Sequence, residues 1–297
     1  MSCARLGIIG ISPGNGHPYS WSAIFNGYEP SIMERCGYPV IPRYLEQQQF
    51  PQDTIALAKV THVWTQEKKL SEHVAQAARI ETIVNNFTDM VGKVDGVLLA
   101  RDDAKNHVQY ALPFLEAGIP IYIDKPLALS VKEASYLIEK QQYPGQLFSC
   151  SALRYARELQ LSQVEKEAIG QLRYLVGRVS KDWDKYAVHV IEPLLLLIGD
   201  NVSLDKTQMW RGENVCSLNV SFSNRVQASI TTLGEINSPV SIKLYGDSGE
   251  KELVFENTFA AFKAALNEFV EGILHRDVRI STDFMLNVVE IIESGRM

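Results

Sequence analysis

Residues 118–128 have the sequence GIPIYIDKPLA. The apolar, β-branched run before Pro126 predicts a buried strand of a parallel sheet, and a helical pattern begins at Ser130. Ligands of open parallel sheets bind beyond the carboxyl ends of the strands, so Asp124 and Lys125 are expected to face a binding crevice. The alternative is that Lys125 is a solvated loop lysine and Pro126 a turn residue. This stretch alone does not choose between the two.

Strand-like and helix-like patterns alternate on both sides of this stretch. Apolar runs of strand length occur at residues 6–11, 60–64, 83–84, 94–100, 119–123 and 147–152. Helical patterns separate them, which predicts an α/β fold with an N-terminal, doubly wound Rossmann domain. We expect this dinucleotide-binding domain to span residues 1–125, with the helix and strand of residues 130–152 completing its sheet.

The turn after the first strand is rich in glycine, and residues 10–20 have the sequence GISPGNGHPYS. A strand, a glycine-rich turn and a helix N-terminus form an anion site, because free backbone N–H groups and the helix dipole point at the turn. The dinucleotide fingerprint G-x-G-x-x-G is only partly kept, since Ser12 and Asn15 stand at its second and third glycines. A tight turn without a ligand is the alternative. The expected pyrophosphate contacts are Gly10, Ser12, Pro13, Gly14, Asn15 and Gly16.

The second strand is preceded by a long connection and followed by a neutral pair. Residues 26–59 are rich in Pro, Gln and Tyr, and so long a connection is often functional or a partner surface. An acidic residue normally accepts the ribose hydroxyls of NAD at the end of the second strand. Thr65 and Gln66 stand there instead. The cofactor is therefore predicted as NAD or NADP, without a choice between them.

Composition excludes several classes of protein. The formal net charge of −6 argues against a nucleic-acid partner. The four cysteines lie far apart without C-x-x-C spacing, which predicts neither a metal site nor a disulfide framework. The N-terminus lacks the apolar core of a signal peptide, and the strongest apolar run, residues 188–198, is too short to cross a membrane. We expect a cytoplasmic protein with a small-molecule substrate and no membrane partner.

Several of these residues together resemble the Gfo/Idh/MocA oxidoreductases, named for glucose–fructose oxidoreductase and inositol dehydrogenase. The family shows a helix with a histidine near its start, an A-G ending, a strand and then E-K-P-x-A. Here these features are His107, residues 117–118 and residues 124–128. Arg154 and Tyr155 are similar to the arginine–aromatic pair that follows the sixth strand of the family.

The resemblance implies a second motif, D-x-G-x-H-x-x-D, whose histidine transfers a proton. Residues 185–192 have the sequence KYAVHVIE, so His189 matches and Glu192 replaces the last aspartate. Lys185 stands where the family has the aspartate that orients the substrate hydroxyl, and Asp184 lies one place earlier. In the family, the lysine of E-K-P, here Lys125, lies beside the nicotinamide and the substrate.

The chemistry of alcohol oxidation calls for these residue types. The hydroxyl proton needs a base while the hydride leaves carbon, and histidine titrates in the right range. An ammonium group stabilises the developing alkoxide. The alternative for His189 is a buried histidine of an apolar helix. The predicted residues are Lys125, His189 and Lys185 for catalysis, Arg154, Tyr155, Asp184 and Glu192 for substrate, and Thr65, Arg101, His107, Asp124 and Lys125 with the glycine turn for the cofactor.

The second half of the sequence predicts a different architecture. Consecutive strand-like runs separated by turns at Asn224 and residues 246–249 indicate a largely antiparallel sheet. We expect residues 153–297 to form an α+β domain for substrate binding and oligomerisation. Residues 215–222 alternate apolar with small polar side chains, as in a sheet covered on one side. In the family such a sheet often pairs two subunits, which implies a homodimer or homotetramer.

Three functions follow from these observations. The first is an NAD(P)-dependent oxidoreductase that transfers a hydride between the nicotinamide and a sugar, sugar derivative or polyol. The second is a glycosidase-type reaction in which a retained NAD is oxidised and reduced within one cycle. The third is a non-catalytic dinucleotide- or sugar-binding protein, suggested by the incomplete glycine fingerprint and by Lys185.

Overall fold

A computed structural model describes residues 3–199 and 202–297, and the chain divides into two compact units. The first unit consists of the chain up to Leu127, residues 135–149 and residues 262–281. The second consists of residues 128–134, 150–261 and 282–297. A segment late in the sequence, residues 262–281, therefore folds with the N-terminal unit.

The first unit contains a six-stranded sheet whose recorded strand pairs are all parallel. Its order is β3-β2-β1-β4-β5-β6, so the chain runs outward from β1 first to one edge and then to the other. This is the predicted doubly wound Rossmann arrangement. The strands are β1 (Ala4–Ile9), β2 (Ala58–Trp64), β3 (Thr82–Ile83), β4 (Gly96–Leu99), β5 (Ile121–Ile123) and β6 (Leu147–Phe148).

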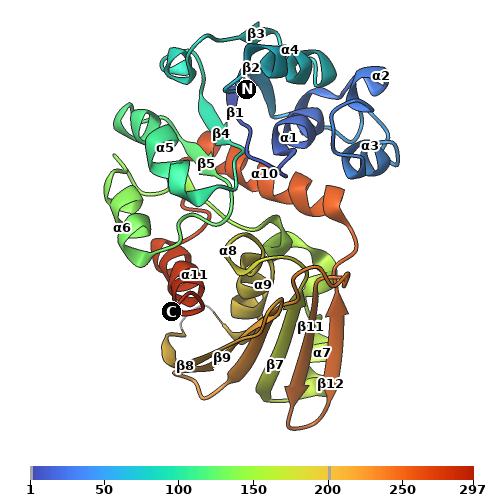
Figure 1. The fold of residues 1–297 in the computed structure, drawn as a ribbon, viewed down its shortest axis with the longest axis vertical. Helices are drawn as coiled ribbons and strands as arrows, with labels where there is room; N and C mark the ends of the chain where they lie inside the picture. The colour runs from blue at the N-terminus through green and yellow to red at the C-terminus, as the bar shows by residue number, and fades with distance from the viewer. Residues whose placement is uncertain (1–2, 200–201) are drawn as a thin grey trace. The chain divides into compact units, whose positions relative to one another are not determined.

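Helices accompany the strands of this sheet. They are α1 (His17–Asn26), α2 (Pro30–Met33), α3 (Val40–Leu45), α4 (Lys68–Ala77), α5 (His107–Glu116), the end of α6 (Val131–Glu139) and most of α10 (Thr258–His275), with short 3₁₀ turns at Phe87–Met90 and Ala104–Asn106. Figure 1 shows α10, in orange, beside the strands of the N-terminal unit. A side chain at Gly96 of β4 would collide with Ile273 of α10, so the glycine permits this close approach.

The second unit contains a mixed, mostly antiparallel sheet in the order β12-β11-β7-β10-β9-β8. The pair β7–β10 is parallel and the other neighbours are antiparallel. The strands are β7 (Leu172–Val179), β8 (Leu204–Arg211), β9 (Cys216–Phe222), β10 (Gln227–Thr232), β11 (Ser241–Gly246) and β12 (Glu250–Val254). The predicted α+β class of the second half is confirmed.

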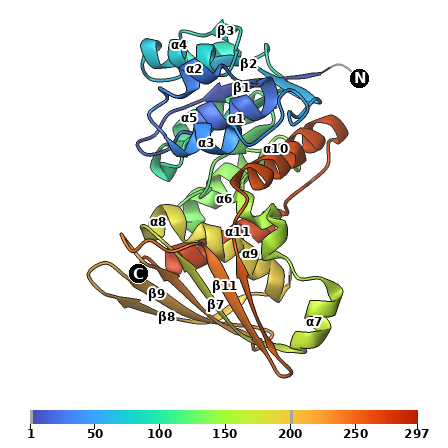
Figure 2. The same cartoon turned by 90° about the vertical axis from the view of Figure 1, so that its right-hand side faces the viewer.

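One face of this second sheet is covered by helices, as Figure 2 shows. The helical segments of the unit are α7 (Gln163–Ile169), α8 (Trp183–Tyr186), α9 (Val188–Ile198) and α11 (Thr282–Ser294), with 3₁₀ turns at Ala152–Tyr155 and Arg157–Leu159. Leu218, Val220 and Phe222 of β9 are buried, and Asn219 between them is exposed. None of the helices described in the structure is long and apolar enough to cross a membrane.

Candidate active site

The carboxyl end of β5 carries Asp124, whose carboxylate is buried and turned toward the glycine-rich turn. Asn15 donates its Nδ2 hydrogen to Asp124 Oδ2 over 2.7 Å, and His17 Nδ1 lies 2.6 Å from the same oxygen. The backbone N–H of Lys125 donates to Oδ1 over 2.8 Å. Burial alone raises the pKa of Asp124, but His17, Lys125 and Asn15 outweigh it and hold this pKa well below its usual range. Asp124 therefore fastens the glycine-rich turn to β5.

Lys125 is buried in the first unit and forms an ion pair there. Its side chain is 7% exposed, and Nζ lies 3.6 Å from Oδ2 of Asp102, whose side chain is 4% exposed. Ser12 donates its hydroxyl hydrogen to Asp102 Oδ1 over 2.6 Å and accepts the backbone N–H of Asp102 over 3.1 Å. A buried ammonium is costly unless an opposite charge compensates it, and Asp102 supplies that charge. The solvated-loop alternative for Lys125 is therefore wrong.

Asp102 was not among the residues predicted from the sequence. The signal for it was present, since the loop after the fourth strand begins with Arg101, Asp102 and Asp103. Strand β4 lies between β1 and β5 in the sheet, so its carboxyl end meets the same edge as the glycine-rich turn and Lys125. The rule that located Lys125 therefore applies equally to Asp102.

The glycine-rich turn uses two of its glycines for packing and leaves one open. A Cβ at Gly10 would lie 2.2 Å from Pro18, and a Cβ at Gly16 would lie 2.6 Å from Ile41. At Gly14, which has φ +82°, a Cβ would meet no described heavy atom within 4 Å. Open space beside a glycine backbone at the start of a helix fits a pyrophosphate.

Hydrogen bonds to the backbone carbonyl and N–H of Ile11 fix the conformation of this turn. Gln66 accepts the N–H of Ile11 and donates to its carbonyl, both over 2.8 Å. Arg101 Nη1 donates to the same carbonyl over 2.9 Å. Gln66 stands where other dinucleotide-binding proteins have the acidic residue that binds the ribose. Its side chain is instead hydrogen-bonded to the backbone of Ile11, just after β1.

Three further residues expected at the cofactor are buried and bonded within the unit. Thr65 donates its hydroxyl hydrogen to the Glu67 carbonyl, and Arg101 binds the Asp103 carboxylate with Nε and Nη2. The ring nitrogens of His107 lie 3.0 and 2.8 Å from the carbonyl oxygens of Leu127 and Arg101, respectively. Direct contact with a cofactor stays a prediction for these side chains.

The second unit gathers another set of predicted residues around Ser151. His189 Nδ1 lies 2.8 Å from Ser151 Oγ, and the Ser151 N–H donates to Glu192 Oε1 over 2.7 Å. Arg154 Nη1 lies 3.6 Å from Glu192 Oε2, and its guanidinium carbon lies 4.4 Å from the centre of the Phe284 ring. Burial raises the pKa of Glu192 to about 7, against the opposing effects of Arg154 and the Ser151 N–H.

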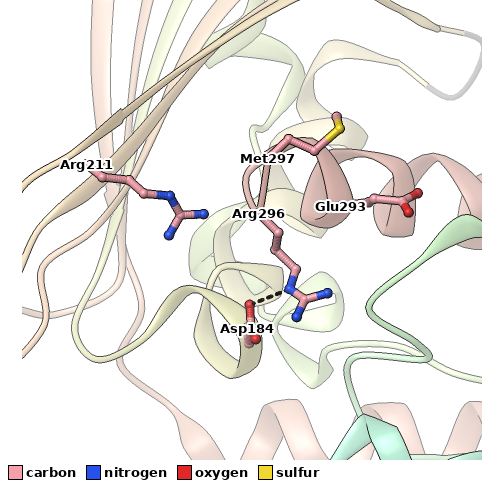
Figure 3. A pocket seen from close by; sticks show the side chains of 5 residues that line it. All are labelled: Asp184, Arg211, Glu293, Arg296 and Met297. Carbon is pink, nitrogen blue, oxygen red and sulfur yellow. Dashed lines mark hydrogen bonds and ion pairs between the residues drawn. The ribbon is translucent and has the colours of Figure 1, made fainter.

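The remaining predicted residues lie at different places in this unit. Tyr155 stacks under the guanidinium of Arg154 at 5.4 Å, and Lys185 donates its backbone N–H to Asp182 in the first turn of α8. Asp184 accepts a hydrogen bond from Arg296 Nε over 3.0 Å. Figure 3 shows this contact in an open cavity of about 480 Å³ lined by Asp184, Arg211, Glu293, Arg296 and Met297.

No group of three or more potential metal ligands occurs among residues 3–199 and 202–297. Lys125, Asp102 and the glycine-rich turn meet at the carboxyl ends of the strands of a doubly wound sheet, where dinucleotides bind in Rossmann folds. The sequence of residues 35–150 matches a family model named for Gfo, Idh and MocA and described as an oxidoreductase family with an NAD-binding Rossmann fold. This segment of the chain thus matches the Gfo/Idh/MocA family, which the sequence resembles.

Solved structures show the same two-unit fold at low sequence identity. Myo-inositol 2-dehydrogenase from Lactobacillus plantarum has a TM-score of 0.75 and 14% identity, covering 99% of this chain and 96% of its own. UDP-N-acetylglucosamine 3-dehydrogenase from Acidithiobacillus ferrooxidans gives 0.73 and 14%, with 100% and 97% coverage. Biliverdin reductase from Synechocystis sp. PCC 6803, with biliverdin and NADP+, gives 0.68 and 13%, with 98% and 97% coverage.

No curated protein matches the sequence. The family match confirms two predictions, an NAD(P)-dependent dehydrogenase or reductase and a nicotinamide dinucleotide as cofactor. The match begins at residue 35, so it does not include the glycine-rich turn.

Proposed function

We propose that the protein transfers a hydride between NAD or NADP and a sugar, sugar derivative or polyol. The observation that carries the proposal is the buried ion pair of Lys125 and Asp102 at the strand ends of an NAD-binding Rossmann fold. The solved structures of inositol and UDP-sugar dehydrogenases with this fold support the choice of a hydroxyl-rich substrate.

The residues that would hold the cofactor are those of the glycine-rich turn, where the backbone at Gly14 faces open space. Bound NAD(P)+ would accept a hydride, that is, the substrate hydrogen together with both electrons of its C–H bond. Lys125 stabilises the developing alkoxide as an ammonium, because Asp102 compensates its charge in a buried position. The hydroxyl O–H bond breaks, and His189 is the base that we propose takes the proton.

The charges of the second unit support a neutral substrate. The side chain of Arg154 is 12% exposed, and Glu192 opposes its charge at 3.6 Å. A substrate carboxylate would have to displace Glu192 to gain a full ion pair. Hydroxyl groups, which donate and accept, suit such a cluster better than an anion does.

The proposal extends to assembly and location. We propose a homodimer or homotetramer, supported by the second sheet, whose β9 strand buries one side and exposes the other. We propose a cytoplasmic location, since a reducing compartment suits a chain whose four cysteines are not joined by disulfide bonds.

Thermal unfolding with NAD, NADP, NADH and NADPH tests the proposal. A dinucleotide at one hundred times its dissociation constant stabilises the native state by about 2.7 kcal/mol. For a chain of this size that raises Tm by roughly 4 °C. Absorbance of the reduced nicotinamide, followed with a panel of inositols and UDP-sugars, then tests turnover. If none of the four dinucleotides shifts Tm, the proposal is wrong; a shift without turnover of any hydroxylated compound favours a binding protein.

A further inference from the structure

His17 begins helix α1, and the buried carboxylate of Asp124 holds its ring. Nδ1 of His17 lies 2.6 Å from Asp124 Oδ2, and the histidine side chain is 17% exposed. The imidazole stacks on Trp21, with the ring centres 4.8 Å apart and the planes 15° apart. The Phe262 ring lies 5.0 Å away at an angle of 73°. One carboxylate and two aromatic rings therefore fix the orientation of the imidazole.

The state of Asp124 determines which ring nitrogen of His17 carries a hydrogen. Burial opposes ionisation of Asp124, but His17, Lys125 and Asn15 outweigh it and keep the pKa of this carboxyl well below its usual range. An ionised carboxylate only accepts hydrogen bonds, so Nδ1 of His17 carries a hydrogen and donates it. Among residues 3–199 and 202–297, Nε2 has no hydrogen-bond partner, and it is not fully buried. Nε2 is therefore the ring nitrogen that a ligand can reach.

The backbone at the start of α1 is already hydrogen-bonded. The first N–H groups of such a helix usually bind the pyrophosphate of a dinucleotide. Here the N–H of His17 donates to Asn15 Oδ1 over 2.8 Å, and Pro18 has no N–H. The next two N–H groups of the helix donate to the carbonyl of Gly16. A phosphate at the turn therefore needs donors other than the first N–H groups of α1.

The side chains that replace two glycines of the fingerprint are also engaged. The Ser12 hydroxyl donates to Asp102, and Asn15 Nδ2 donates to Asp124. Residues 10–17 are all described in the structure, and their polar side chains are those of Ser12, Asn15 and His17. Of these three, His17 is the one with a polar atom that has no described partner. It is thus the side chain of the turn that is best suited to contact a ligand.

We propose that His17 binds the pyrophosphate of the dinucleotide through Nε2, in place of the backbone N–H groups that usually do so at this helix. The inference rests on the proposed function, which requires a dinucleotide at the turn. A phosphate oxygen only accepts hydrogen bonds, so the contact needs a hydrogen on Nε2 as well as on Nδ1. In the complex the ring is therefore an imidazolium. Its charge is opposed by Asp124 and by the phosphate, and its face lies on Trp21.

Binding of NADH and of ADP-ribose to a His17→Phe variant tests the proposal. Phenylalanine keeps an aromatic ring against Trp21 and removes both nitrogens. The variant is expected to bind NADH about 10- to 100-fold more weakly than the wild type, because a charge-assisted hydrogen bond is lost. ADP-ribose has the pyrophosphate but no nicotinamide, so its Kd, measured by calorimetry, is expected to rise by the same factor. NADPH and 2′-phospho-ADP-ribose replace the two probes if thermal unfolding favours NADP.

Two results of this experiment would overturn the proposal. The first is an unchanged Kd for NADH in His17→Phe. The second is a loss confined to NADH, because Nε2 would then contact the nicotinamide end of the cofactor and not the pyrophosphate. If the wild type binds none of the dinucleotides, the proposed function fails together with this inference. If the wild type binds and His17→Phe binds equally well, the inference fails alone.

Nitrogen-15 NMR of the wild type gives a readout that does not depend on the affinity of a variant. The chain has six histidines, and the signal of His17 is assigned by its absence from His17→Phe or from His17→Gln. Saturating ADP-ribose is expected to bring both ring nitrogens of His17 to the chemical shifts of protonated nitrogen. An Nε2 signal that stays the same on saturation would overturn the proposal.

His73→Phe is the matched control. His73 Nδ1 lies 2.8 Å from the hydroxyl of Tyr19, so this histidine also contacts α1 but does not bond to Asp124. The substitution is expected to leave the Kd values of NADH and ADP-ribose within twofold of the wild type. Weakening equal to that of His17→Phe would show a general loosening of α1 and overturn the proposal.

Discussion

The ion pair of Lys125 and Asp102 shows how a single residue sets the chemistry of another. An unpaired charge in the protein interior costs several kcal/mol, so a lysine 7% exposed needs a fixed counter-charge. Asp102 is fixed because Ser12 contacts both its carboxylate and its backbone N–H. The serine at the second glycine position of the fingerprint therefore has a function of its own. It anchors the counter-charge of Lys125.

Asp102→Asn is expected to destabilise the native state by about 3 kcal/mol, because the amide still accepts from Ser12 but the buried ion pair with Lys125 is lost. Urea unfolding measures this loss. In a Lys125→Met background the same substitution is expected to cost much less, since no charge is left unpaired. Equal costs in the two backgrounds would show that the two side chains are not energetically coupled.

For single residues, the sequence predicted where the site residues lie better than it predicted which residues they contact. Lys125, His189 and Glu192 were located from motifs, because each motif places a residue at a strand end or on a helix face. Asp124 was expected in the crevice, whereas its carboxylate binds Asn15 and His17. Asp102 and Ser151 were missed because their contacts join segments about 20 to 90 residues apart in the chain. No local pattern records such contacts.

At the scale of elements, the long connection between α1 and β2 supplies a cover for the glycine-rich turn. It contains α2 and α3, and Tyr38 and Ile41 lie against Gly16. A glycine is needed at position 16 for packing, since a Cβ there would lie 2.6 to 2.8 Å from these side chains. The periodicity of such short helices is too weak to predict them, and their packing is a tertiary effect.

Apolar residues at helical spacing on α10 form part of the first unit. Phe269 is 3% exposed, and its ring centre lies 5.7 Å from that of Tyr122 and 5.8 Å from that of Phe148. Phe269→Ala is expected to cost about 3–5 kcal/mol of unfolding free energy, because it leaves a cavity between β5, β6 and the helix. Denaturant unfolding monitored by tryptophan fluorescence measures it.

Tyr136→Ala is the control for this prediction, since Tyr136 is an aromatic residue with 40% exposure. Its removal is expected to change stability by less than about 1 kcal/mol. If Phe269→Ala is equally mild, α10 does not stabilise the first unit as the structure indicates.

In the whole molecule, the two sheets were predicted from local periodicity, but two pairings of distant segments were not. Alternating strands and helices predicted the parallel sheet, and consecutive strands predicted the mostly antiparallel one, because both follow from local periodicity. The return of residues 262–281 to the N-terminal unit depends on which apolar faces meet in space. So does the parallel pairing of β7 with β10, which lie some 50 residues apart. Neither pairing leaves a local pattern in the sequence, so neither could be predicted from it.

Stability as a function of pH is a property of the whole molecule to which Glu192 makes a defined contribution. Burial raises the pKa of its carboxyl from 4.5 to about 7 in the folded state. Between these two values the native state binds more protons than the unfolded state, so stability falls as pH rises. The contribution is complete below pH 4.5, is lost as pH rises through about 7, and amounts to roughly 3 kcal/mol.

Glu192→Gln removes this titration while keeping an acceptor for the Ser151 N–H, so the difference between the two proteins isolates it. From pH 5 to pH 8, the unfolding free energy of the wild type is expected to fall relative to that of the variant by roughly 2–3 kcal/mol. Above pH 8 the difference is expected to become constant. Urea unfolding at half-unit pH steps measures both curves, and other titrating groups cancel in their difference. Parallel curves from pH 5 to pH 8 would mean that Arg154 keeps the buried carboxylate ionised throughout, and the raised pKa would then be wrong.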